Sequence, residues 1–275
     1  MLENKKILVT GGAGFIGSHL VERLSNNNND VVVIDNLLRK SKINKSIKNN
    51  INFVQGDVRD LDIMITSTKN IDYVFHLAAY LGVDDVAKNP IETMEVETIG
   101  TQNLINACLK NSVKKIIYTS TSGVYGKSAI QDSVNEDYEV APTSSYAIAK
   151  RFNEIYLKSI SEKYKIETFS LRYFNVYGPR QDNRMVIPKF FEQALLNIPL
   201  TVYGNGNQTR DFTFIDDTID ATLIIAEKCK GNGIFNIARG TDTTMNDLAN
   251  EVIKITESKS KIKHEDAPFL RFDFD

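Results

Sequence analysis

A glycine-rich turn near the N-terminus most narrows the folds open to this chain. Residues 10–17 read Thr-Gly-Gly-Ala-Gly-Phe-Ile-Gly, between an apolar strand-like run and a helix-like segment. A G-x-G-x-x-G spacing between strand and helix is typical of sites that hold a dinucleotide pyrophosphate on backbone amides. Gly11 and Gly14 allow the tight turn and the approach of the phosphates, and Gly17 allows the helix to pack closely on the strand. The alternative, a glycine-rich turn without a ligand, does not account for the strand and helix around it.

Short runs rich in Val and Ile alternate with longer helix-like segments over the first two thirds of the chain. The runs are almost continuously apolar, as in parallel strands that helices cover on both faces. We therefore predict an α/β fold, a doubly wound parallel sheet of the Rossmann type. The predicted strands are Lys6–Thr10, Asp30–Ile34, Ile51–Gln55, Tyr73–Leu77, Lys115–Ser120 and Thr168–Arg172.

The spacing of apolar residues also predicts two long helices, over Pro90–Lys110 and Tyr146–Lys163. Beyond Arg172 the alternation weakens, and prolines and glycines interrupt shorter elements. We accordingly expect a dinucleotide-binding domain over residues 1–172 and a smaller, mainly substrate-binding lobe over 173–275.

Acidic residues follow the second and third predicted strands. Asp35 is placed to accept hydrogen bonds from the adenosine ribose, and its carboxylate would repel a 2′-phosphate, which favours NAD. Arg39 and Lys40 follow closely and could attract that phosphate, so NADP stays an alternative. Asp57 lies where an acid can contact the adenine amino group, although in isolation it would be an ordinary turn aspartate.

Composition excludes several classes of partner. The formal net charge of −2 and the scattered Lys and Arg residues are not those of a protein that binds nucleic acid or a membrane surface. No apolar run approaches the ~20 residues that cross a bilayer. The two cysteines, Cys108 and Cys229, lie in apolar stretches and are interpreted as buried free thiols, with a disulfide as the minor alternative. We expect a cytoplasmic protein with a small-molecule partner and no metal ion.

Tyr146 and Lys150 stand four residues apart in the second long helix, which places them on one face. A phenol with a pKa near ~10 is a weak base at neutral pH, but a nearby ammonium and a positive nicotinamide ring both favour phenolate. Tyr146 is therefore a candidate general base. A Y-x-x-x-K pair also occurs by chance on ordinary helices, and only the glycine turn upstream favours the catalytic interpretation.

At this point the sequence resembles the extended short-chain dehydrogenase/reductase family, and within it the NAD-dependent nucleotide-sugar epimerases and dehydratases, most of all the UDP-sugar 4-epimerases. The resemblance covers nearly the whole chain and depends on several motifs in the expected order. They are the turn Gly11–Gly17, Asp57-Val58, His76-Leu77-Ala78-Ala79, the segment 119–126 (Thr-Ser-Thr-Ser-Gly-Val-Tyr-Gly), the Tyr146/Lys150 pair and the segment 172–180 (Arg-Tyr-Phe-Asn-Val-Tyr-Gly-Pro-Arg).

The resemblance implies roles for particular residues. Tyr146, Lys150 and Thr121 would be catalytic, with Thr121 hydrogen-bonding the sugar 4-hydroxyl; Ser120 or Ser122 could substitute for it. His76 would lie beside the cofactor but is not assigned a catalytic role. The cofactor would contact Gly11, Gly14, Phe15, Ile16, Gly17, Asp35, Asn36, Asp57, Val58, Leu77, Ala78, Ala79, Tyr146 and Lys150. The nucleotide sugar would contact Thr121, Ser122, Asn175 and Arg180, and its diphosphate Arg210 and Arg271.

The strand end after Thr121 bears on the reaction. Dehydratases of the family resemble Thr-Asp-Glu here and decarboxylases Thr-Ser-Glu, whereas this chain has Ser122 and Gly123. Without the extra acid, we expect reversible oxidation at C4 through a 4-keto sugar, which is epimerisation. The alternatives are a dehydratase, a decarboxylase or a reductase of the same family, or a non-catalytic NAD-binding regulator.

Two departures from the family pattern stand out. Glu97 occupies a position where relatives usually have asparagine. The chain ends at Asp275 where relatives usually continue, so we expect either a shortened substrate lobe or a truncated product. In dimeric relatives the two long helices pair as a four-helix bundle, and the resemblance therefore implies a homodimer; the alternative is that the apolar residues of these helices pack inside one chain. The resemblance points to a nucleotide-diphosphate sugar, most simply a UDP-sugar, as the substrate.

Overall fold

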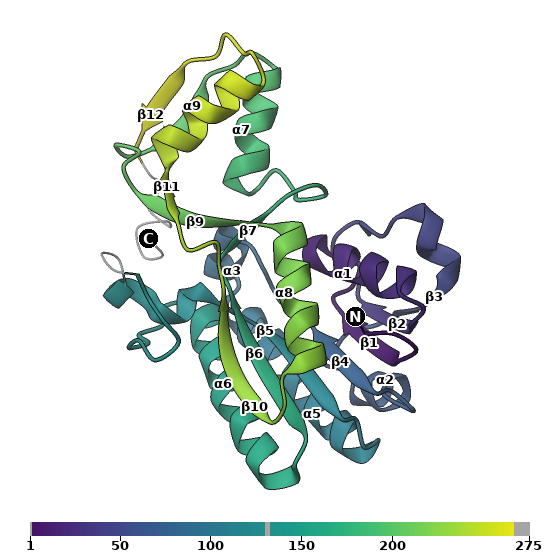
Figure 1. Cartoon of the computed structure of the whole chain (residues 1–275). Helices are drawn as coiled ribbons and strands as arrows, with labels where there is room; N and C mark the ends of the chain where they lie inside the picture. Colours follow the sequence, from purple (N-terminus) through teal and green to yellow (C-terminus); the bar gives the residue numbers. More distant parts are fainter. Residues whose placement is uncertain (1, 130–132, 267–275) are drawn as a thin grey trace.

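All six strands predicted from the sequence form, with ends that differ by at most one residue from the prediction. The computed structural model describes residues 2–129 and 133–266. Within them, a seventh strand joins these six, and all lie parallel in the order β10-β6-β5-β4-β1-β2-β3 (Figure 1). The strands are β1 (Lys6–Thr10), β2 (Asp30–Asp35), β3 (Ile51–Gln55), β4 (Tyr73–His76), β5 (Lys115–Thr121), β6 (Glu167–Tyr173) and β10 (Asn232–Ile237). The predicted doubly wound fold is confirmed.

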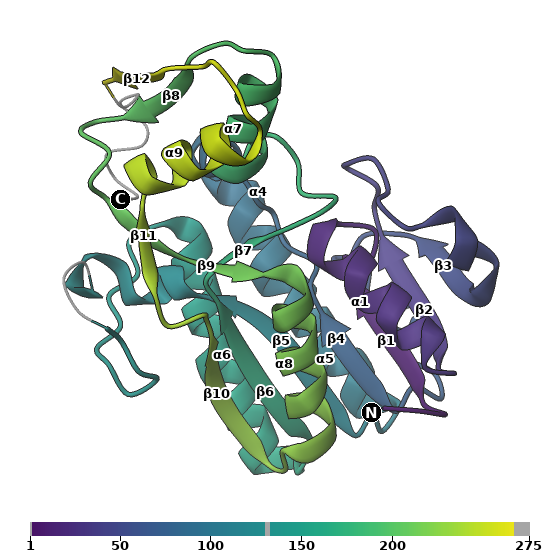
Figure 2. The same ribbon diagram turned by 45° about the horizontal axis from the view of Figure 1, so that its top comes forward.

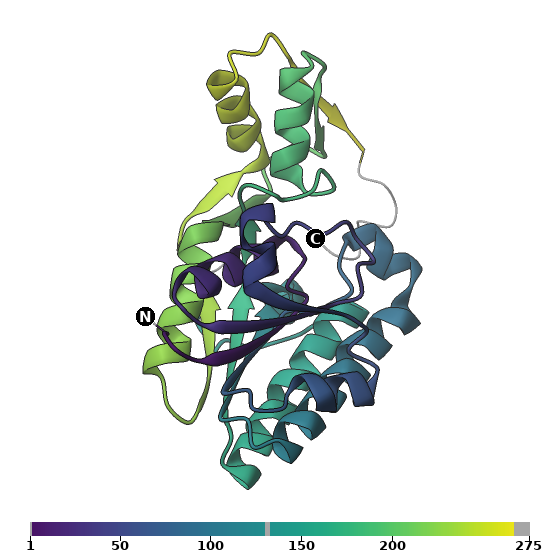
Figure 3. The same ribbon diagram turned by 90° about the vertical axis from the view of Figure 1, so that its right-hand side faces the viewer.

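Helices cover both faces of this sheet, as Figure 3 shows. Helices α1 (Phe15–Asn26) and α8 (Ile215–Lys228) pack on one face; α2 (Leu61–Ser67), α5 (Gly100–Lys110) and α6 (Ser145–Tyr164) pack on the other. Successive residues of a strand contribute to opposite cores. On β5, for example, Ile117 joins the α1/α8 core, whereas Ile116 and Tyr118 join the other. This two-sided burial explains why the strands are continuously apolar rather than alternating.

The predicted helix over Pro90–Lys110 is continuous but not uniform. It begins as α4 (Pro90–Met94), widens into the π-helical segment Glu95–Ile99 and continues as α5. Single π-helical turns inside α-helices are rare and are frequent at functional sites. Shorter elements elsewhere are α3 (Val83–Lys88) and the 3-10 segments Lys45–Asn50 and Ser122–Ala129.

A smaller lobe stands above the carboxyl edge of the large sheet (Figure 2). In it, β7 (Asn175–Tyr177) pairs in parallel with β9 (Thr209–Phe214), and β11 (Asp242–Thr244) pairs antiparallel with β9. Strand β8 (Leu200–Tyr203) pairs with β12 (Ile262–Glu265), and helices α7 (Val186–Leu195) and α9 (Met245–Ile255) complete the lobe. Its own core includes Ile187, Phe190, Leu200, Val202, Phe212, Met245, Ala249 and Val252.

The chain returns to the large sheet after it has entered the small lobe. Helix α8 packs on the sheet, and β10 pairs along the whole of β6, from Asn232 opposite Thr168 to Ile237 opposite Tyr173. Residues 215–237 therefore belong to the large layer, although they fall inside the range 173–275 expected for the substrate lobe. The sequence of β10, Asn-Gly-Ile-Phe-Asn-Ile, gives only a weak strand signal because Gly and Asn are poor strand formers.

Two smaller expectations concern burial. Cys108 is a buried free thiol and Cys229 a half-buried one, so the two are not joined in a disulfide. Across the described part of the chain, no helix is both long and apolar enough to cross a membrane.

Candidate active site

A cavity of about 760 Å³ lies between the large sheet and the small lobe. Residues that end or directly follow β1, β2, β4, β5 and β6 line one side of it, and Tyr177, Ile187 and Phe212 of the small lobe line the other. The strand order reverses at β1 and β4, the position where open α/β sheets bind their ligands. The topology therefore brings the segments singled out in the sequence to one site.

The glycine turn forms a cradle that side chains would fill. Gly11 has a φ of 68°, and a Cβ atom there would lie 2.7 Å from the backbone nitrogen of Ala78. A Cβ on Gly17 would lie 2.2 Å from the carbonyl oxygen of Gly11. At Gly14, which precedes α1, no side chain caps the helix. The first turn of α1 thus keeps backbone N–H groups for an anion, and the cradle fits a pyrophosphate.

Asp35 lies at the end of β2 and lines the same cavity. Its carboxylate oxygens accept hydrogen bonds from the backbone N–H groups of Ala13 (3.0 Å) and Leu37 (2.9 Å). Burial raises the pKa of Asp35, and the two backbone donors oppose that rise. These bonds fix the carboxylate beside the glycine turn, where it can accept further hydrogen bonds from a ribose.

The neighbouring charged residues are already paired. Asp57 accepts hydrogen bonds from Arg59, which lower the pKa of its carboxyl to about 2 against burial, and Asn36 donates to it at 3.3 Å. Arg39, which could have held a 2′-phosphate, donates to Asp85 at 2.7 Å, and Lys42 donates to the carbonyl of Arg180. The cavity is also lined by the other apolar residues expected to contact the cofactor, namely Phe15, Ile16, Val58, Leu77, Ala78 and Ala79.

Tyr146 is in the first turn of α6, where the side chain of Ser144 caps the helix by accepting from Ala147 N–H. Tyr146 lines the cavity, and the fully buried Lys150 lies behind it, with its Nζ 5.3 Å from the Tyr146 ring centroid. Burial, followed by the negative charge of Glu97, raises the pKa of Tyr146 well above its usual value. The expected pair is therefore assembled, but in the protein alone its surroundings favour the protonated phenol.

Thr121 ends β5 and lines the cavity together with Tyr146. Its Oγ1 accepts a hydrogen bond from Gly123 N–H at 3.1 Å. Ser120 also lines the cavity, but its hydroxyl donates to the buried Glu154 at 2.6 Å. Ser122 is not among the described residues that line the cavity. Of the hydroxyls of Ser120, Thr121 and Ser122, that of Thr121 thus lies at the cavity without a hydrogen bond to a carboxylate.

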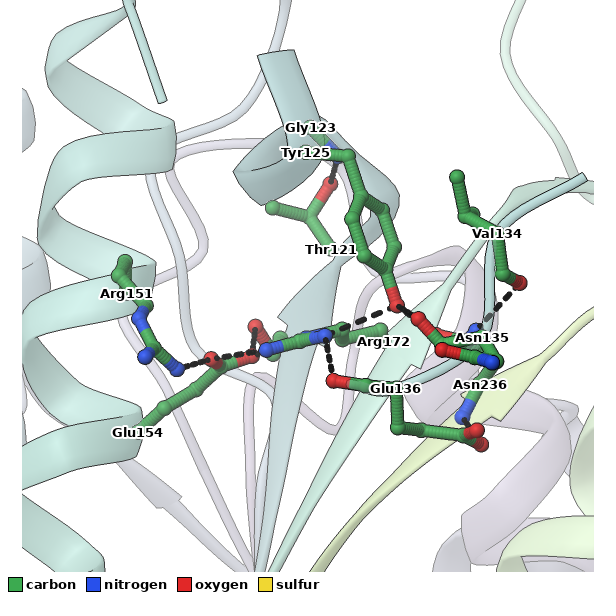
Figure 4. Close-up of polar contacts among 11 residues, drawn as sticks. Thr121, Gly123, Tyr125, Val134, Asn135, Glu136, Arg151, Glu154, Arg172 and Asn236 are labelled. Carbon is green, nitrogen blue, oxygen red and sulfur yellow. Dashed lines mark hydrogen bonds and ion pairs between the residues drawn. The ribbon is translucent and has the colours of Figure 1, made fainter. Parts of the chain in front are cut away.

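Behind this strand end lies a buried polar network that the sequence did not reveal (Figure 4). Glu154 of α6 receives two hydrogen bonds of 2.9 Å from Arg172 of β6, and one from Arg151. Arg172 also donates to the Tyr125 hydroxyl at 2.8 Å. Both members of the Glu154–Arg172 pair are about 1% exposed. The network holds α6, which carries Tyr146, against β6 and, through the Ser120 hydroxyl, against β5, which carries Thr121.

His76 has the surroundings of a structural group. Its ring nitrogens lie 2.6 Å from the Thr10 hydroxyl and 3.1 Å from the Thr101 hydroxyl, and it is 1% exposed. Burial, with a smaller effect of Lys150, lowers the pKa of His76 to about 3. The imidazole is therefore neutral at physiological pH.

The residues expected to bind substrate are only partly brought together. Asn175 lines the cavity and donates to the carbonyl of Asp211. Arg180 pairs with Glu22 of α1, and within the described chain neither Arg180 nor Arg210 of β9 lines the cavity. Arg271 lies outside the described residues. Arg184, which the sequence did not single out, does line the cavity and pairs with Asp182 and Asp85.

Comparison with known proteins identifies the family. The profile of the "NAD dependent epimerase/dehydratase family" matches residues 7–238, which include the glycine turn, the Tyr146/Lys150 pair and the β10 return. The chain belongs to this family. The family predicted from the sequence motifs is thus confirmed, and NAD is its cofactor.

Relatives of the epimerase/dehydratase family differ in the reaction they carry out. A UDP-N-acetyl-alpha-D-glucosaminuronate decarboxylase of Bacillus cytotoxicus is 38% identical, over 94% of this chain and 83% of the relative. A putative UDP-glucose 4-epimerase of Methanocaldococcus jannaschii is 40% identical, over 88% and 79% respectively. The solved UDP-N-acetylglucosamine 4-epimerase of Methanobrevibacter ruminantium M1, in complex with UDP-N-acetylmuramic acid, matches with a TM-score of 0.90 and 36% identity, covering 98% of this chain and 87% of that one. This family member is therefore an NAD-dependent enzyme of the nucleotide-sugar epimerase, dehydratase and decarboxylase group.

No group of three or more His, Cys, Asp or Glu side chains is placed to hold a metal ion in residues 2–129 and 133–266.

Proposed function

We propose that the protein epimerises the C4 carbon of a nucleotide-diphosphate sugar, through a transient 4-keto sugar. The observation that carries this proposal is the composition of the strand end at the reacting side of the cavity. Tyr146 and Thr121 line it together, and the segments 119–123 and 173–175 around them contain no carboxylate. Loss of water or CO2 from the sugar calls for an additional acid, and Gly123 stands where such relatives have glutamate.

Each residue has a proposed role. Tyr146 takes the proton of the sugar 4-hydroxyl and later returns it, while Thr121 hydrogen-bonds the same oxygen and orients it. Bound NAD supplies reversible hydride transfer to and from C4. Asp35 and the glycine turn hold the cofactor, with Lys150 supporting Tyr146 from behind. Because the proton and the hydride both return to the sugar, no net redox change results.

The nucleotide sugar is proposed to be a UDP-sugar, as in the named relatives. Among the arginines expected to bind its diphosphate, Arg210 and Arg271 stay proposals, whereas the ion pair with Glu22 makes Arg180 a weaker candidate. Arg184 is a further candidate because it already lines the cavity. A guanidinium suits a diphosphate because its donors form a planar fork.

We also propose a homodimer formed through α4, the π-helical segment that follows it, and α6. Large apolar side chains are exposed on these helices, among them Ile91 (75%), Ile155 (56%) and Phe152 (51%). Adjacent helices α4 and α6 contact each other, so these side chains can form one surface. Two such helices from each of two copies would bury the surface in a four-helix bundle.

The test of the reaction is a panel of UDP-, dTDP-, GDP- and CDP-sugars incubated with the protein and NAD, with products followed by NMR and mass spectrometry. A C4 epimer of unchanged mass supports the proposal, and loss of water or CO2 refutes it in favour of a dehydratase or decarboxylase. In deuterated water, label appearing on C4 would exclude direct hydride return. Binding of NAD without any turnover would instead support a non-catalytic regulator.

Tyr146→Phe tests the assigned base. We expect turnover to fall by about 10²–10⁴-fold, the usual contribution of general acid–base catalysis, with NAD binding retained. Tyr164→Phe is a matched control, because Tyr164 ends the same helix and is 49% exposed. Equal turnover in Tyr146→Phe and the control would remove Tyr146 from the mechanism.

A further inference from the structure

The residue that departs most from the family pattern lies directly behind the catalytic pair. Glu97 is in the π-helical segment Glu95–Ile99, and its Oε2 is 3.0 Å from the Nζ of Lys150. The side chain of Glu97 is about 1% exposed, and that of Lys150 is not exposed at all. Where relatives usually have a neutral asparagine, this chain therefore has a buried ion pair.

The carboxylate of Glu97 is held firmly in place. Its Oε1 accepts a hydrogen bond from the backbone N–H of Tyr80, a residue that lines the cavity. The backbone carbonyl of Glu97 accepts from the Thr101 hydroxyl (2.6 Å) and from the Asn153 side chain (2.9 Å). The ion pair is thus built into the wall of the site rather than formed by a mobile side chain.

The other titratable groups around Lys150 are uncharged or already paired. On β5, the Tyr118 ring lies 4.7 Å from Nζ, and burial raises the pKa of its hydroxyl well above the usual value. On β4, His76 is neutral. On β6, Arg172 is neutralised by Glu154 of α6 itself. In the described part of the chain, Glu97 is therefore the carboxylate that balances the charge of Lys150.

An ammonium whose charge is neutralised by a carboxylate does little to lower the pKa of a neighbouring phenol. Opposite charges stabilise one another strongly in a buried site, and a lone lysine cation beside Tyr146 would favour phenolate. Burial raises the pKa of Glu97, and the adjacent Lys150 ammonium and the Tyr80 N–H oppose that rise. Ionised beside Lys150, Glu97 makes the pair neutral overall, and its carboxylate opposes a second negative charge on Tyr146. Burial and Glu97 accordingly act in the same direction on the Tyr146 pKa.

We propose that Glu97 is a positioning residue that neutralises Lys150, so that Tyr146 stays a protonated phenol until the positively charged nicotinamide ring of NAD enters the site. Tyr146 would then lose its proton to solvent, and the positive charge of bound NAD, rather than that of Lys150 alone, would favour that loss. The enzyme would thereby avoid holding a phenolate beside NADH, whose ring is neutral. This inference rests on the proposed function only for the role of Tyr146 as the base.

The test is a pH titration of Tyr146 in the full chain, saturated with either NAD or NADH. Tyrosine labelled with ¹³C at Cζ reports ionisation by NMR, and Tyr146→Phe assigns the signal. In wild-type protein we expect the Tyr146 midpoint to be at least about one pH unit lower with NAD than with NADH, a tenfold change in proton affinity. A Tyr146 that is already ionised at pH 7 with NADH would overturn the proposal without any further variant.

Variants at position 97 separate charge from shape. With NADH bound, Glu97→Gln and Glu97→Asn should each lower the Tyr146 midpoint by at least about one pH unit, because they remove the opposing charge. Glu97→Asp should stay close to wild type. Glu95→Gln is the matched control, since Glu95 is in the same π-helical segment but is 46% exposed and close to Arg59.

Two results would overturn the assignment to Glu97. One is an unchanged Tyr146 midpoint in both Glu97→Gln and Glu97→Asn; the other is an equal change in Glu97→Asp, which would indicate packing rather than charge. The titration contains no sugar, so its result does not depend on whether the protein shows epimerase activity. Conversely, if the protein is an epimerase but the Tyr146 midpoint does not change with substitutions at position 97, the proposed function stands and this inference is wrong.

Discussion

Replacing Glu154 by Gln should destabilise the protein through the partner that it leaves behind. The two side chains have nearly the same shape, so the change removes a charge without creating a cavity. Arg172 would then be a buried cation, about 1% exposed, whose two 2.9 Å hydrogen bonds to the carboxylate are weakened or lost. Breaking a buried ion pair by removing one partner costs about 3–5 kcal/mol. At about 2–4 °C per kcal/mol for a chain of this size, the melting temperature should fall by roughly 6–20 °C.

Urea unfolding followed by circular dichroism measures the loss. A double-mutant cycle with Arg172→Met isolates the coupling, because the double variant no longer contains a fully buried unpaired charge and should lose less than the sum of the single variants. Burial raises the pKa of Glu154, but hydrogen bonds from Arg172 and Ser120 outweigh it, so the folded-state pKa is lowered below 4.5. Because its pKa is lower in the folded state, Glu154 stabilises the fold at pH values above its pKa in the unfolded chain. This stabilisation disappears as the pH falls through its pKa in the folded protein.

The loss of unfolding free energy caused by Glu154→Gln should therefore be constant between pH 6 and 8 and become smaller below about pH 4.5. A loss under about 1 kcal/mol at pH 7, within the range of an ordinary surface change, would refute the reasoning. So would additive single variants, because additivity would mean that the two side chains do not stabilise each other.

Three further predictions concern the cofactor and the helical surface. Gly17→Ala should weaken NAD binding at least about tenfold and lower the unfolding free energy by about 1–3 kcal/mol, because the new Cβ meets the Gly11 carbonyl oxygen at 2.2 Å. An unchanged NAD affinity in calorimetry would contradict the assignment of the glycine turn as the pyrophosphate site. Asp35→Ser should move the NADP-to-NAD affinity ratio at least about tenfold towards NADP, as measured by fluorescence titration, and an unmoved ratio would mean that this carboxylate does not select the cofactor. Phe152→Glu, on a ring that is 51% exposed, should convert a dimer to a monomer in analytical ultracentrifugation without changing circular dichroism, and a persisting dimer would place the interface elsewhere.

The sequence predicted the elements that local patterns encode. A strand such as Lys6–Thr10 was located because its continuous apolar run, Ile7–Val9, ends abruptly at polar and glycine residues. The glycine turn was located because its backbone geometry admits few other residues. Tyr146 and Lys150 needed no tertiary information, since a helix fixes their relation.

Features that depend on distant partners were not predictable in this way. Glu97 and Lys150 are 53 positions apart in the chain, and no local pattern indicates that their side chains meet. The direction of a long side chain is equally hidden: Arg180 turns to Glu22 on α1, a residue far upstream, rather than into the cavity. Strand β10 escaped prediction because its position at the edge of the sheet comes from pairing with β6, not from its own composition.

The return of α8 and β10 to the large sheet decides how the molecule can be divided. The polypeptide passes between the layers at β6 to β7, at β9 to α8 and at β10 to β11, so neither layer is one uninterrupted stretch of sequence. A fragment that ends at residue 172 would lack the strand and the helix that cover β6, leaving Phe169 and Leu171 uncovered along an open strand edge. Such an edge is a template for pairing with other chains, so the fragment should aggregate when expressed. Production of the large layer alone would require joining residues 1–173 to 215–237 through a new linker and ending the chain there, so that both segments of the small lobe, one before α8 and one after β10, are removed.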